Sequence, residues 1–377
     1  MEAVRPALRR VEGFIGKNTV MVIALAAAVI TCFIVPPDKQ YLEYFDLKTL
    51  TCLFCVLAIV CALRNIDFFY ILAEKIVHCF RTLRLCVLAL AYITFIGSML
   101  IANDMALLTF LPLGYFVLHA ARREKYMAFT FIMQNIAANL GGMLTPFGNP
   151  QNLYLYSKFD IPTAQFVKIM APPFALAVLM ITVCCLCVPG ERIRVPDERK
   201  RLDPKRTAIY LAAFALAIAI VFRGIPYFIG LIVIPAVLFI YDKKALKQVD
   251  YPLLLTFVFF FVFAGNMARI PAVGRFFGGL LSKNTLIFSA LSCQLISNVP
   301  SAILLSQFTA DYPALLVGVN IGGTGTLIAS LASLITYREF CSHEPGKKPY
   351  YIGMFTAFNF GFLAILTLFM LVICTVD

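Results

Sequence analysis

Most of the chain consists of long apolar segments that short polar or basic stretches interrupt. A helix that crosses a bilayer needs about 20 apolar residues, because it must satisfy its own backbone hydrogen bonds across about 30 Å of hydrocarbon. Nine segments fit this requirement, at 20–36, 48–63, 126–157, 163–188, 207–223, 225–241, 251–268, 311–336 and 350–375. The pattern therefore predicts an all-α polytopic membrane protein with about nine transmembrane helices.

Two further apolar segments, 85–118 and 284–310, carry a polar break in the middle. The first break reads Ala102-Asn103-Asp104, and the second reads Ser297-Asn298-Val299-Pro300. We expect each segment to form a re-entrant hairpin that enters and leaves the bilayer on the same side.

Composition excludes a soluble protein. Apolar residues make up 61% of the 377 positions and charged residues only 14%, whereas a soluble domain carries about 25% charge. The net charge of +12 would indicate nucleic acid in a soluble protein. Here the positions of the charges indicate membrane orientation instead, and we expect a lipid bilayer and no nucleic acid as partner.

The basic residues predict the orientation. With the N-terminus inside, 24 of the 32 Lys and Arg residues lie in inner segments and 8 in outer ones, as expected for cytoplasmic loops. If 85–118 crossed only once, every later loop would invert and this bias would collapse. We predict an integral protein of a bacterial-type plasma (inner) membrane, with a cytoplasmic N-terminus and the C-terminus outside.

The sequence also contains an internal repeat. Residues 139–145 read NLGGMLT and 320–326 read NIGGTGT, and each follows an Asn-tipped apolar hairpin. The predicted domains are a cytoplasmic N-terminus (1–19), a first half (20–188), a basic cytoplasmic linker (189–206) and a second half (207–377). The two halves enter from opposite sides, which is the inverted repeat of secondary transporters.

The repeated motif predicts discontinuous helices at the bilayer midplane. Paired glycines lower helix propensity, and Pro146 and Pro150 lack amide donors. Broken backbone at that depth is tolerated only if it is buried in protein or lines a cavity. Exposed helix N-termini suit an anion, and freed carbonyl and side-chain oxygens suit a small cation such as Na⁺.

The segments NLGGMLTPFGNPQN (139–152), SNVPSAILL (297–305) and NIGGTGTLIASLAS (320–333) resemble the ion transporter superfamily. This group includes citrate permeases, divalent-anion/sodium symporters, arsenite-pump membrane subunits and sodium/proton antiporters, and the resemblance covers residues 45–375. It implies a scaffold domain, a transport domain with two hairpins, substrate between the hairpin tips and a homodimer with elevator-type movement.

The hairpin tips separate branches of this superfamily. In sodium/dicarboxylate members each tip carries Ser-Asn-Thr, which binds Na⁺ and substrate carboxylate. Asn103, Ser297 and Asn298 match that pattern, whereas the first Ser and both Thr are replaced. The chain is closer to the citrate, arsenite and antiporter branch.

The predicted site residues are mainly amides, hydroxyls and glycines at the two tips and the two breaks. Asp104 is the candidate for a coupling ion or proton, because a carboxyl inside the membrane is costly and usually functional. The full set is Asn103, Asp104, Asn139, Gly142, Thr145, Asn149, Asn152, Ser297, Asn298, Asn320, Gly323, Thr324, Thr326 and Ser330. We expect no resident cofactor or metal beyond Na⁺ or H⁺ as coupling ion, with Na⁺ near Asn103, Asp104 and Asn298.

The leading hypothesis is a secondary transporter of a small anion, citrate-like or an inorganic oxyanion, coupled to Na⁺ or H⁺. A cation/proton antiporter or arsenite exporter of the same fold is the alternative, and Asp104 favours the antiporter. A passive channel would share the repeat. An enzyme is not expected, because the sequence shows no HExxH motif, no Ser/His pair and no paired intramembrane carboxylates.

Overall fold

The computed structural model describes residues 18–193 and 202–374. The predicted N-terminal segment and part of the predicted linker, at 1–17 and 194–201, lie outside this range. The described chain is helical, and its β pairing is a single isolated bridge between Thr82 and Arg192. Among the described residues, six helices are long and apolar enough to cross a membrane, and four shorter apolar helices accompany them. The prediction of an all-α polytopic membrane protein is confirmed at this level.

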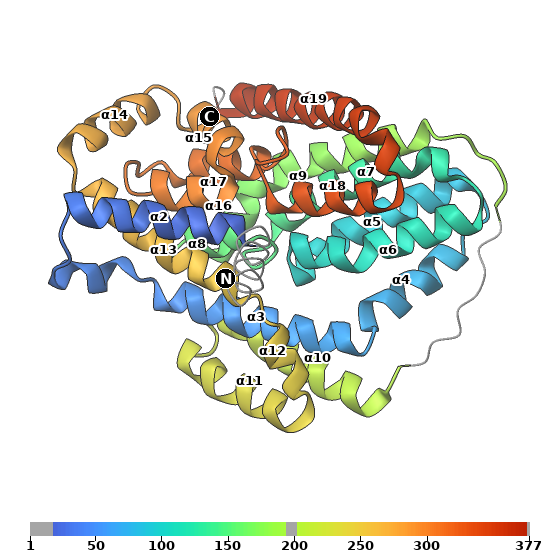
Figure 1. The fold of residues 1–377 in the computed structure, drawn as a ribbon, viewed down its shortest axis with the longest axis horizontal. Coiled ribbons are helices and arrows are strands. Elements are labelled where there is room, and N and C mark those ends of the chain that lie inside the picture. Colours follow the sequence, from blue (N-terminus) through green and yellow to red (C-terminus); the bar gives the residue numbers. More distant parts are fainter. Residues whose placement is uncertain (1–17, 194–201, 375–377) are drawn as a thin grey trace, which may run out of the picture.

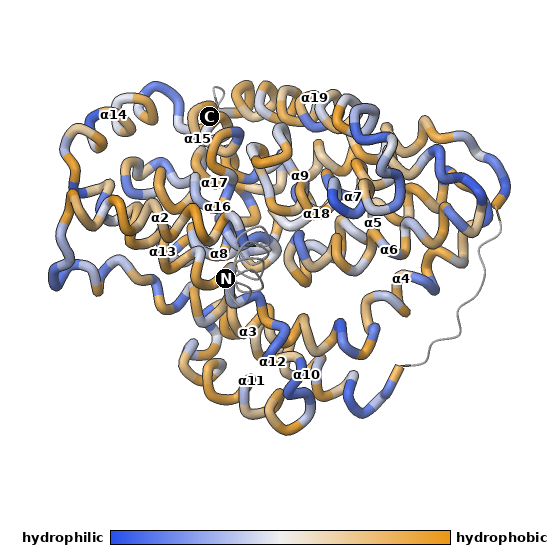
Figure 2. Tube along the Cα trace, in the orientation of Figure 1, coloured by the Kyte–Doolittle hydropathy of each residue, from blue (hydrophilic) through white to orange (hydrophobic). Residues whose placement is uncertain are grey.

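Seven of the predicted spans correspond to single helices. They are α2 (Thr19–Ile34), α3 (Leu47–Asn65), α9 (Thr163–Leu186), α10 (Pro204–Val221), α11 (Tyr227–Tyr241), α13 (Tyr251–Ala268) and α19 (Lys348–Cys374). Shorter helices connect them: α4 (Phe68–His78), α12 (Lys243–Gln248) and α14 (Pro271–Leu281). In Figure 2 the hydrophobic colour follows the helices, while hydrophilic residues gather in the connecting loops.

The two interrupted apolar segments each form a pair of helices joined by one residue. The first pair is α5 (Leu83–Ile101) and α6 (Asn103–Ala120), and the second is α15 (Thr285–Ile296) and α16 (Asn298–Leu305). The joining residues Ala102 and Ser297 have φ angles of 67° and 74°. Non-glycine residues rarely adopt positive φ. Both tips therefore use the same unusual backbone conformation to join their two helices.

Each of the two repeated motifs lies where one helix ends and another begins. The first break separates α7 (Met127–Gly141) from α8 (Pro150–Lys158), with a 3₁₀ turn at Gly142–Leu144, and the second separates α17 (Tyr312–Ile321) from α18 (Leu331–His343). Asn149 and Ser330 precede the second helix of each pair in the same extended conformation, with φ/ψ of −133°/141° and −147°/142°. The residue that precedes the second helix therefore has the same conformation in both breaks, whereas Gly325, with φ of 114°, occurs only in the second.

The first glycine of each motif permits close packing of a helical pair on a broken helix. α5 packs on α7, and α15 packs on α17. A methyl group at Gly141 would collide with the Phe95 carbonyl oxygen and lie 2.6 Å from the Ser98 hydroxyl. At Gly322 it would lie 2.8 Å from the Cys293 sulfur. Glycine is needed at both positions because backbone and side chain approach too closely for a β-carbon.

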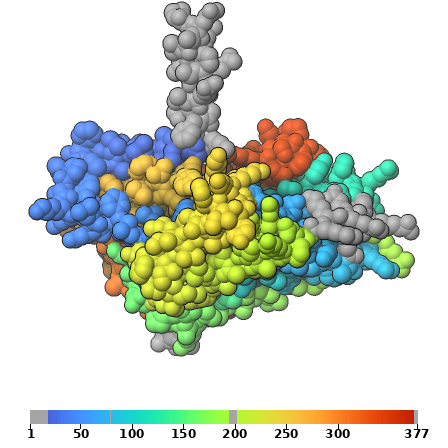
Figure 3. All heavy atoms as spheres, turned by 90° about the horizontal axis from the view of Figure 1, so that it is seen from below, coloured from blue at the N-terminus to red at the C-terminus, as the bar shows by residue number. Residues whose placement is uncertain are grey.

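The two halves also exchange contacts. α6 of the first pair packs on α18 of the second broken helix, and α16 of the second pair packs on α8 of the first. In Figure 1, α5 and α6 lie at the right, α2 and α13 at the left, and α19 along the top. α10, α11 and α12 pack on α3 at the bottom and form the surface facing the viewer in Figure 3.

We expect Gly141→Ala to lower the stability of the purified protein by about 1–3 kcal/mol, because overpacking displaces α5 from α7. Thermal unfolding in detergent measures the effect. Gly353→Ala is the matched control, since Gly353 lies within α19 and a methyl group there meets nothing within 4 Å. That control is expected to be neutral or slightly stabilising. Equal unfolding temperatures for the two variants would contradict the packing argument.

Candidate functional site

A cavity of about 990 Å³ lies where the two helical pairs meet the two breaks. Its polar wall comes from both tips and from the starts of α8 and α18. The tip residues are Asn103, Asp104, Ser297 and Asn298, and the helix starts contribute Pro150, Gln151, Ser330 and Leu331. Segments almost 200 residues apart in the sequence therefore contribute to one wall.

Four helices begin at this cavity. α6 begins at Asn103, α16 at Asn298, α8 at Pro150 and α18 at Leu331. The first amide groups of a helix have no partner within the helix and carry partial positive charge. Some of these amides, such as those of Asp104, Asn298 and Val299, already bind acceptors within the protein. The convergence of the four helix starts gives this end of the cavity partial positive charge.

A network of buried amide side chains lies directly behind the tips. Asn139 donates from Nδ2 to the Asn135 carbonyl at 3.3 Å and accepts at Oδ1 from Asn103 Nδ2 at 3.2 Å. Asn103 Oδ1 in turn accepts from the backbone N–H of Asp104 at 2.9 Å. The first tip is thereby attached to the first broken helix.

Asn149 joins the two halves. Its Nδ2 donates to the Asn139 carbonyl at 3.1 Å and to Asn320 Oδ1, also at 3.1 Å. Asn320 Nδ2 donates to the Leu316 carbonyl at 2.8 Å and to Asn152 Oδ1 at 2.6 Å. The two repeated asparagines, Asn139 and Asn320, therefore share Asn149 as a partner and lie close together.

The second glycine of each motif lies against this network. A methyl group at Gly323 would lie 3.1 Å from Asn298 Nδ2 and 3.7 Å from Asn139 Oδ1. At Gly142 it would collide with Asn149 Oδ1. The absence of a β-carbon lets the amides of both halves approach the broken backbone.

The threonines of the motif make structural contacts. Thr145 Oγ1 donates to the Met99 carbonyl at 2.8 Å, and Thr326 Oγ1 donates to the Gln294 carbonyl at 3.2 Å. Each acceptor lies three residues before its tip residue. Thr324 Oγ1 donates to a carbonyl of the preceding turn at 2.6 Å. The Thr145 and Thr326 hydroxyls attach the breaks to the helical pairs, whereas the Thr324 hydroxyl bonds within its own broken helix.

Five of the predicted site residues line the cavity: Asn103, Asp104, Ser297, Asn298 and Ser330. The other nine are placed behind or beside that wall, namely Asn139, Gly142, Thr145, Asn149, Asn152, Asn320, Gly323, Thr324 and Thr326. The structure thus separates residues that can meet a solute from those that hold the wall in place.

Asp104 places a carboxyl group at the cavity wall. Among the described residues, its Oδ1 atom is buried without a hydrogen-bond partner. Asp250 and Arg338 are the other charged side chains that line the cavity in the described chain. An unpaired carboxylate oxygen at this place can receive a proton or contact a cation.

Sequence reasoning missed several polar residues of the cavity wall, among them Gln151, Asp250 and Arg338. Gln151 lies between Asn149 and Asn152, but the corresponding residue in the second copy of the repeat is Ala332. A comparison of the two copies therefore does not single out Gln151 as a polar position. Asp250 and Arg338 stand at the ends of apolar segments, where the sequence alone indicates only interface charges. Their exposure to one cavity depends on how α13 and α18 pack.

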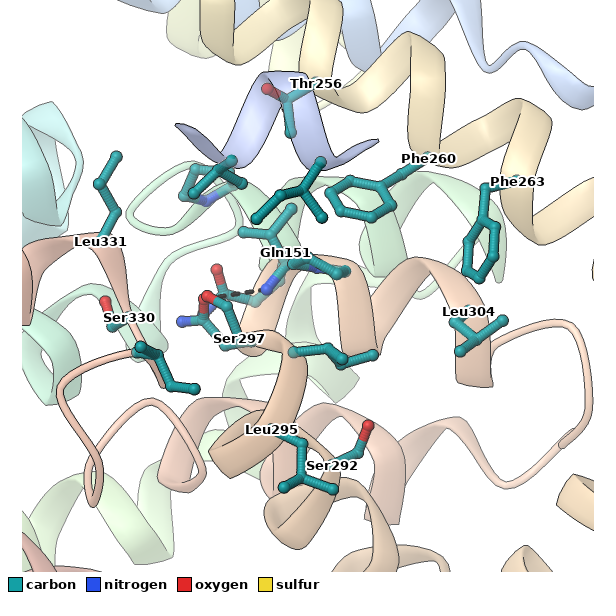
Figure 4. Close-up of a pocket in the computed structure, with 18 of the residues that line it drawn as sticks. Gln151, Thr256, Phe260, Phe263, Ser292, Leu295, Ser297, Leu304, Ser330 and Leu331 are labelled. Carbon is teal, nitrogen blue, oxygen red and sulfur yellow. Dashed lines mark hydrogen bonds between the residues drawn. The ribbon is translucent and has the colours of Figure 1, made fainter. Parts of the chain in front are cut away.

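The remainder of the cavity wall is mainly apolar, with Thr256 and Ser292 among its polar members. Figure 4 shows Gln151, Ser297 and Ser330 grouped at one side, with Phe260, Phe263 and Leu304 at the other. A solute that filled the cavity would contact polar side chains and helix N-termini at one end and apolar side chains at the other.

Comparisons with known proteins agree with this architecture. Residues 11–314 match the model of the citrate transporter (CitMHS) family. The chain is also 32% identical over 322 residues to an uncharacterized transporter of Methanocaldococcus jannaschii, covering 84% of this chain and 88% of that protein. The chain belongs to the citrate transporter family. It is further 27% identical over 343 residues to the inner membrane protein YbiR of Escherichia coli, covering 88% of this chain and 90% of that protein.

Membership in this family makes the chain an integral membrane transporter and confirms the expectation of a transporter instead of an enzyme. It also confirms the resemblance to the ion transporter superfamily. The cavity at the four helix starts is therefore the candidate solute site of a transporter.

Proposed function

We propose that the chain is a secondary transporter that moves a small anion by alternating access, coupled to Na⁺ or H⁺. The anion is citrate- or dicarboxylate-like, or an inorganic oxyanion. The observation that carries this proposal is the convergence of four helix N-termini on one cavity. Helix N-termini inside a membrane bind the anionic groups of transported solutes.

The side chains at the tips support an anion further. Asn298 Oδ1 accepts from the Val299 backbone N–H at 2.9 Å, and this contact turns the Nδ2 group away from its own helix. Asn298 Nδ2 then remains as a donor at the cavity. Donors to a charged acceptor form hydrogen bonds about twice as strong as neutral pairs.

Contacts of α9 support the inverted repeat. α9 has 24 residues, about 36 Å at 1.5 Å per residue, enough to cross a bilayer. At its C-terminal end the Val188 carbonyl accepts from Arg84 at 2.7 Å, and Arg123 lies 2.7 Å from Glu191. These two arginines flank the open end of the α5–α6 pair.

The other end of α9 lies beside the second pair. Gln165 donates to the Tyr312 hydroxyl at 2.7 Å, and the Phe159 and Tyr312 rings lie 5.4 Å apart. Tyr312 follows the turn that leaves α16. The two helical pairs thus open toward opposite ends of α9, as two re-entrant hairpins entering from opposite faces would.

The proposed organisation keeps the predicted ranges, with transmembrane halves at 20–188 and 207–377, a cytoplasmic N-terminus and linker, and the C-terminus outside. The distribution of 24 inner and 8 outer basic residues supports this orientation. We include a homodimer with elevator-type movement in the proposal on the strength of the superfamily resemblance.

A cation/proton antiporter is the second candidate, and one observation favours it. The unpartnered Oδ1 of Asp104 is an acceptor that an anion does not satisfy. In the anion transporter, the same oxygen binds the coupling cation or proton while the helix N-termini bind the solute.

Asn298→Ala tests the anion site. We expect affinity for the transported anion to fall about tenfold to a hundredfold, because a donor to a charged group is removed. Thermal shift with citrate, succinate, sulfate and arsenite first identifies the anion, and titration then measures the loss. Asn284→Ala, at the N-cap of α15 and outside the cavity, is the control. Unchanged affinity in Asn298→Ala would remove this residue from the site.

Asp104→Asn tests coupling. The variant keeps the shape of the side chain but can neither release a proton nor carry a charge, so uptake driven by a Na⁺ or pH gradient into proteoliposomes is expected to fall to passive leak. Asp311→Asn is the control, because Asp311 caps α17 outside the cavity and asparagine caps equally well. Gradient-driven accumulation at the normal rate in Asp104→Asn would refute the coupling role.

Arg122→Cys and Lys283→Cys test the opposite entry of the two pairs. Both side chains are exposed, after α6 and before α15 respectively. In a background with the exposed Cys79 and Cys187 changed to serine, a membrane-impermeant thiol reagent should label the first only from the cytoplasm and the second only from outside. Labelling of both from one side would exclude the inverted repeat.

A further inference from the structure

Two charged side chains of the cavity wall, Asp250 and Arg338, have no role in the proposed function. Both are exposed, and with Asp104 they are the charged residues that line the cavity in the described chain. Asp250 caps α13, where its Oδ1 atom accepts from the Leu253 backbone N–H at 3.0 Å. Arg338 forms no ion pair with another described residue. Its charge is therefore available to a solute in the cavity.

Arg338 lies on a face of α18 that leads away from the polar wall of the cavity. Ser330, Leu334 and Arg338 are four residues apart, so they share this face, and all three line the cavity. Ser330 lies at the polar side in Figure 4, and Arg338 is about 12 Å further along the helix axis. Beyond Arg338, the His343 ring stacks on Tyr115 of α6 at 3.7 Å. Arg338 is therefore displaced from the tips toward the open end of the α5–α6 pair.

α2 and α13 begin at the same end of the cavity. Asn266, near the end of α13, donates to Thr31, near the end of α2, at 3.2 Å, so these packed helices run in the same direction. Asp250 and Thr19, at their starts, both line the cavity. In the proposed orientation the segments before α2 and α13 and the segment after α18 are cytoplasmic. Asp250 and Arg338 then form a cytoplasmic mouth of the cavity.

The other end of the cavity carries no charged lining residue in the described chain. α14 follows the end of α13, and there the wall consists of Phe276, Leu280, Leu281 and, from α15, Phe288. A charge beside a cleft with low-dielectric walls concentrates solutes of the opposite charge in that cleft. Arg338 and Asp250 therefore act on a solute that enters through the mouth.

We propose that Arg338 is a docking residue that draws the transported anion into the cytoplasmic mouth, and that Asp250 weakens this attraction. The pair controls entry from the cytoplasm, and the anion then passes Leu334 to reach the four helix N-termini. The inference rests on the proposed anion site and goes beyond it, because it adds a first docking point about 12 Å before that site.

Leu334→Cys reports the electrostatic potential of this path, because Leu334 is half-buried and lines the cavity one helical turn from both Ser330 and Arg338. The exposed and half-buried cysteines are changed to serine, and the same background without Leu334→Cys gives the blank rate. The full-length protein in membrane vesicles reacts with anionic sulfonatoethyl methanethiosulfonate or with cationic trimethylammonium-ethyl methanethiosulfonate. The ratio of the two rates measures the charge preference of the mouth and needs no transported solute.

We expect Arg338→Gln to lower the anion-to-cation rate ratio about threefold to tenfold at low salt, because a charge about 6 Å away is removed. Asp250→Asn should raise the ratio. Both effects should shrink in about 1 M salt, where the Debye length is about 3 Å. Arg338→Lys keeps the charge and should keep the ratio. Arg275→Gln is the matched control, because Arg275 is exposed on α14 outside the cavity lining, and it should leave the ratio unchanged.

Transport of citrate provides the second readout. Arg338→Gln should raise the half-saturating citrate concentration about threefold or more at the cytoplasmic side, while the maximal rate and the value at the external side stay unchanged, because only entry through the mouth is affected. Equal effects at both sides would overturn the docking role.

The labelling outcomes separate this inference from the proposed function. An unchanged ratio in Arg338→Gln, an equal fall in Arg275→Gln, or labelling of Leu334→Cys only from the side that labels Lys283→Cys would overturn the mouth while the anion site stands. If the ratios change as expected but none of the four anions of the thermal-shift panel binds, the proposed anion function fails and the docking role fails with it.

Discussion

The structure depends on how backbone that is broken within a membrane protein satisfies its hydrogen bonds. Each break frees carbonyl and amide groups that lipid cannot satisfy. The amides of Asn149 and Asn152 bind the carbonyls of Asn139, Gly142 and Met143, and Gln294 binds those of Gly322 and Thr324. The chain can therefore expose helix N-termini to a cavity without leaving the surrounding backbone unpaired.

The same bonds connect parts that a transporter must coordinate. Asn149 contacts both repeated asparagines, and the tips contact the breaks through Asn103 and through Ser297, which donates to the Ala329 carbonyl at 3.2 Å. Unpaired members of a buried amide network are costly, so the bonds from Asn149 to the Asn139 carbonyl and to Asn320 favour a defined arrangement of the two breaks.

The cavity combines two chemistries that suit different parts of a bound solute. Helix N-termini and Asn298 supply donors, whereas Asp104 supplies an acceptor without a partner among the described residues. A simple anion site needs only the donors. In the proposed transporter the Asp104 oxygen binds the coupling ion or proton, while the helix N-termini bind the solute.

The sequence by itself determined the helical membrane architecture, the positions of the two tips and two breaks, and the pairing of Asn139 with Asn320, because lipid imposes span length and broken backbone needs glycine, proline and amides at fixed places. Only the tertiary structure decided which of these residues meet the cavity. Thr145 and Thr326 proved to hold the breaks against α5 and α15, while Gln151, Asp250 and Arg338 proved to line the wall. The reason is physical: a polar residue near a break can face a solute or a neighbouring backbone carbonyl, and the choice depends on the packing of helices that are distant in the chain.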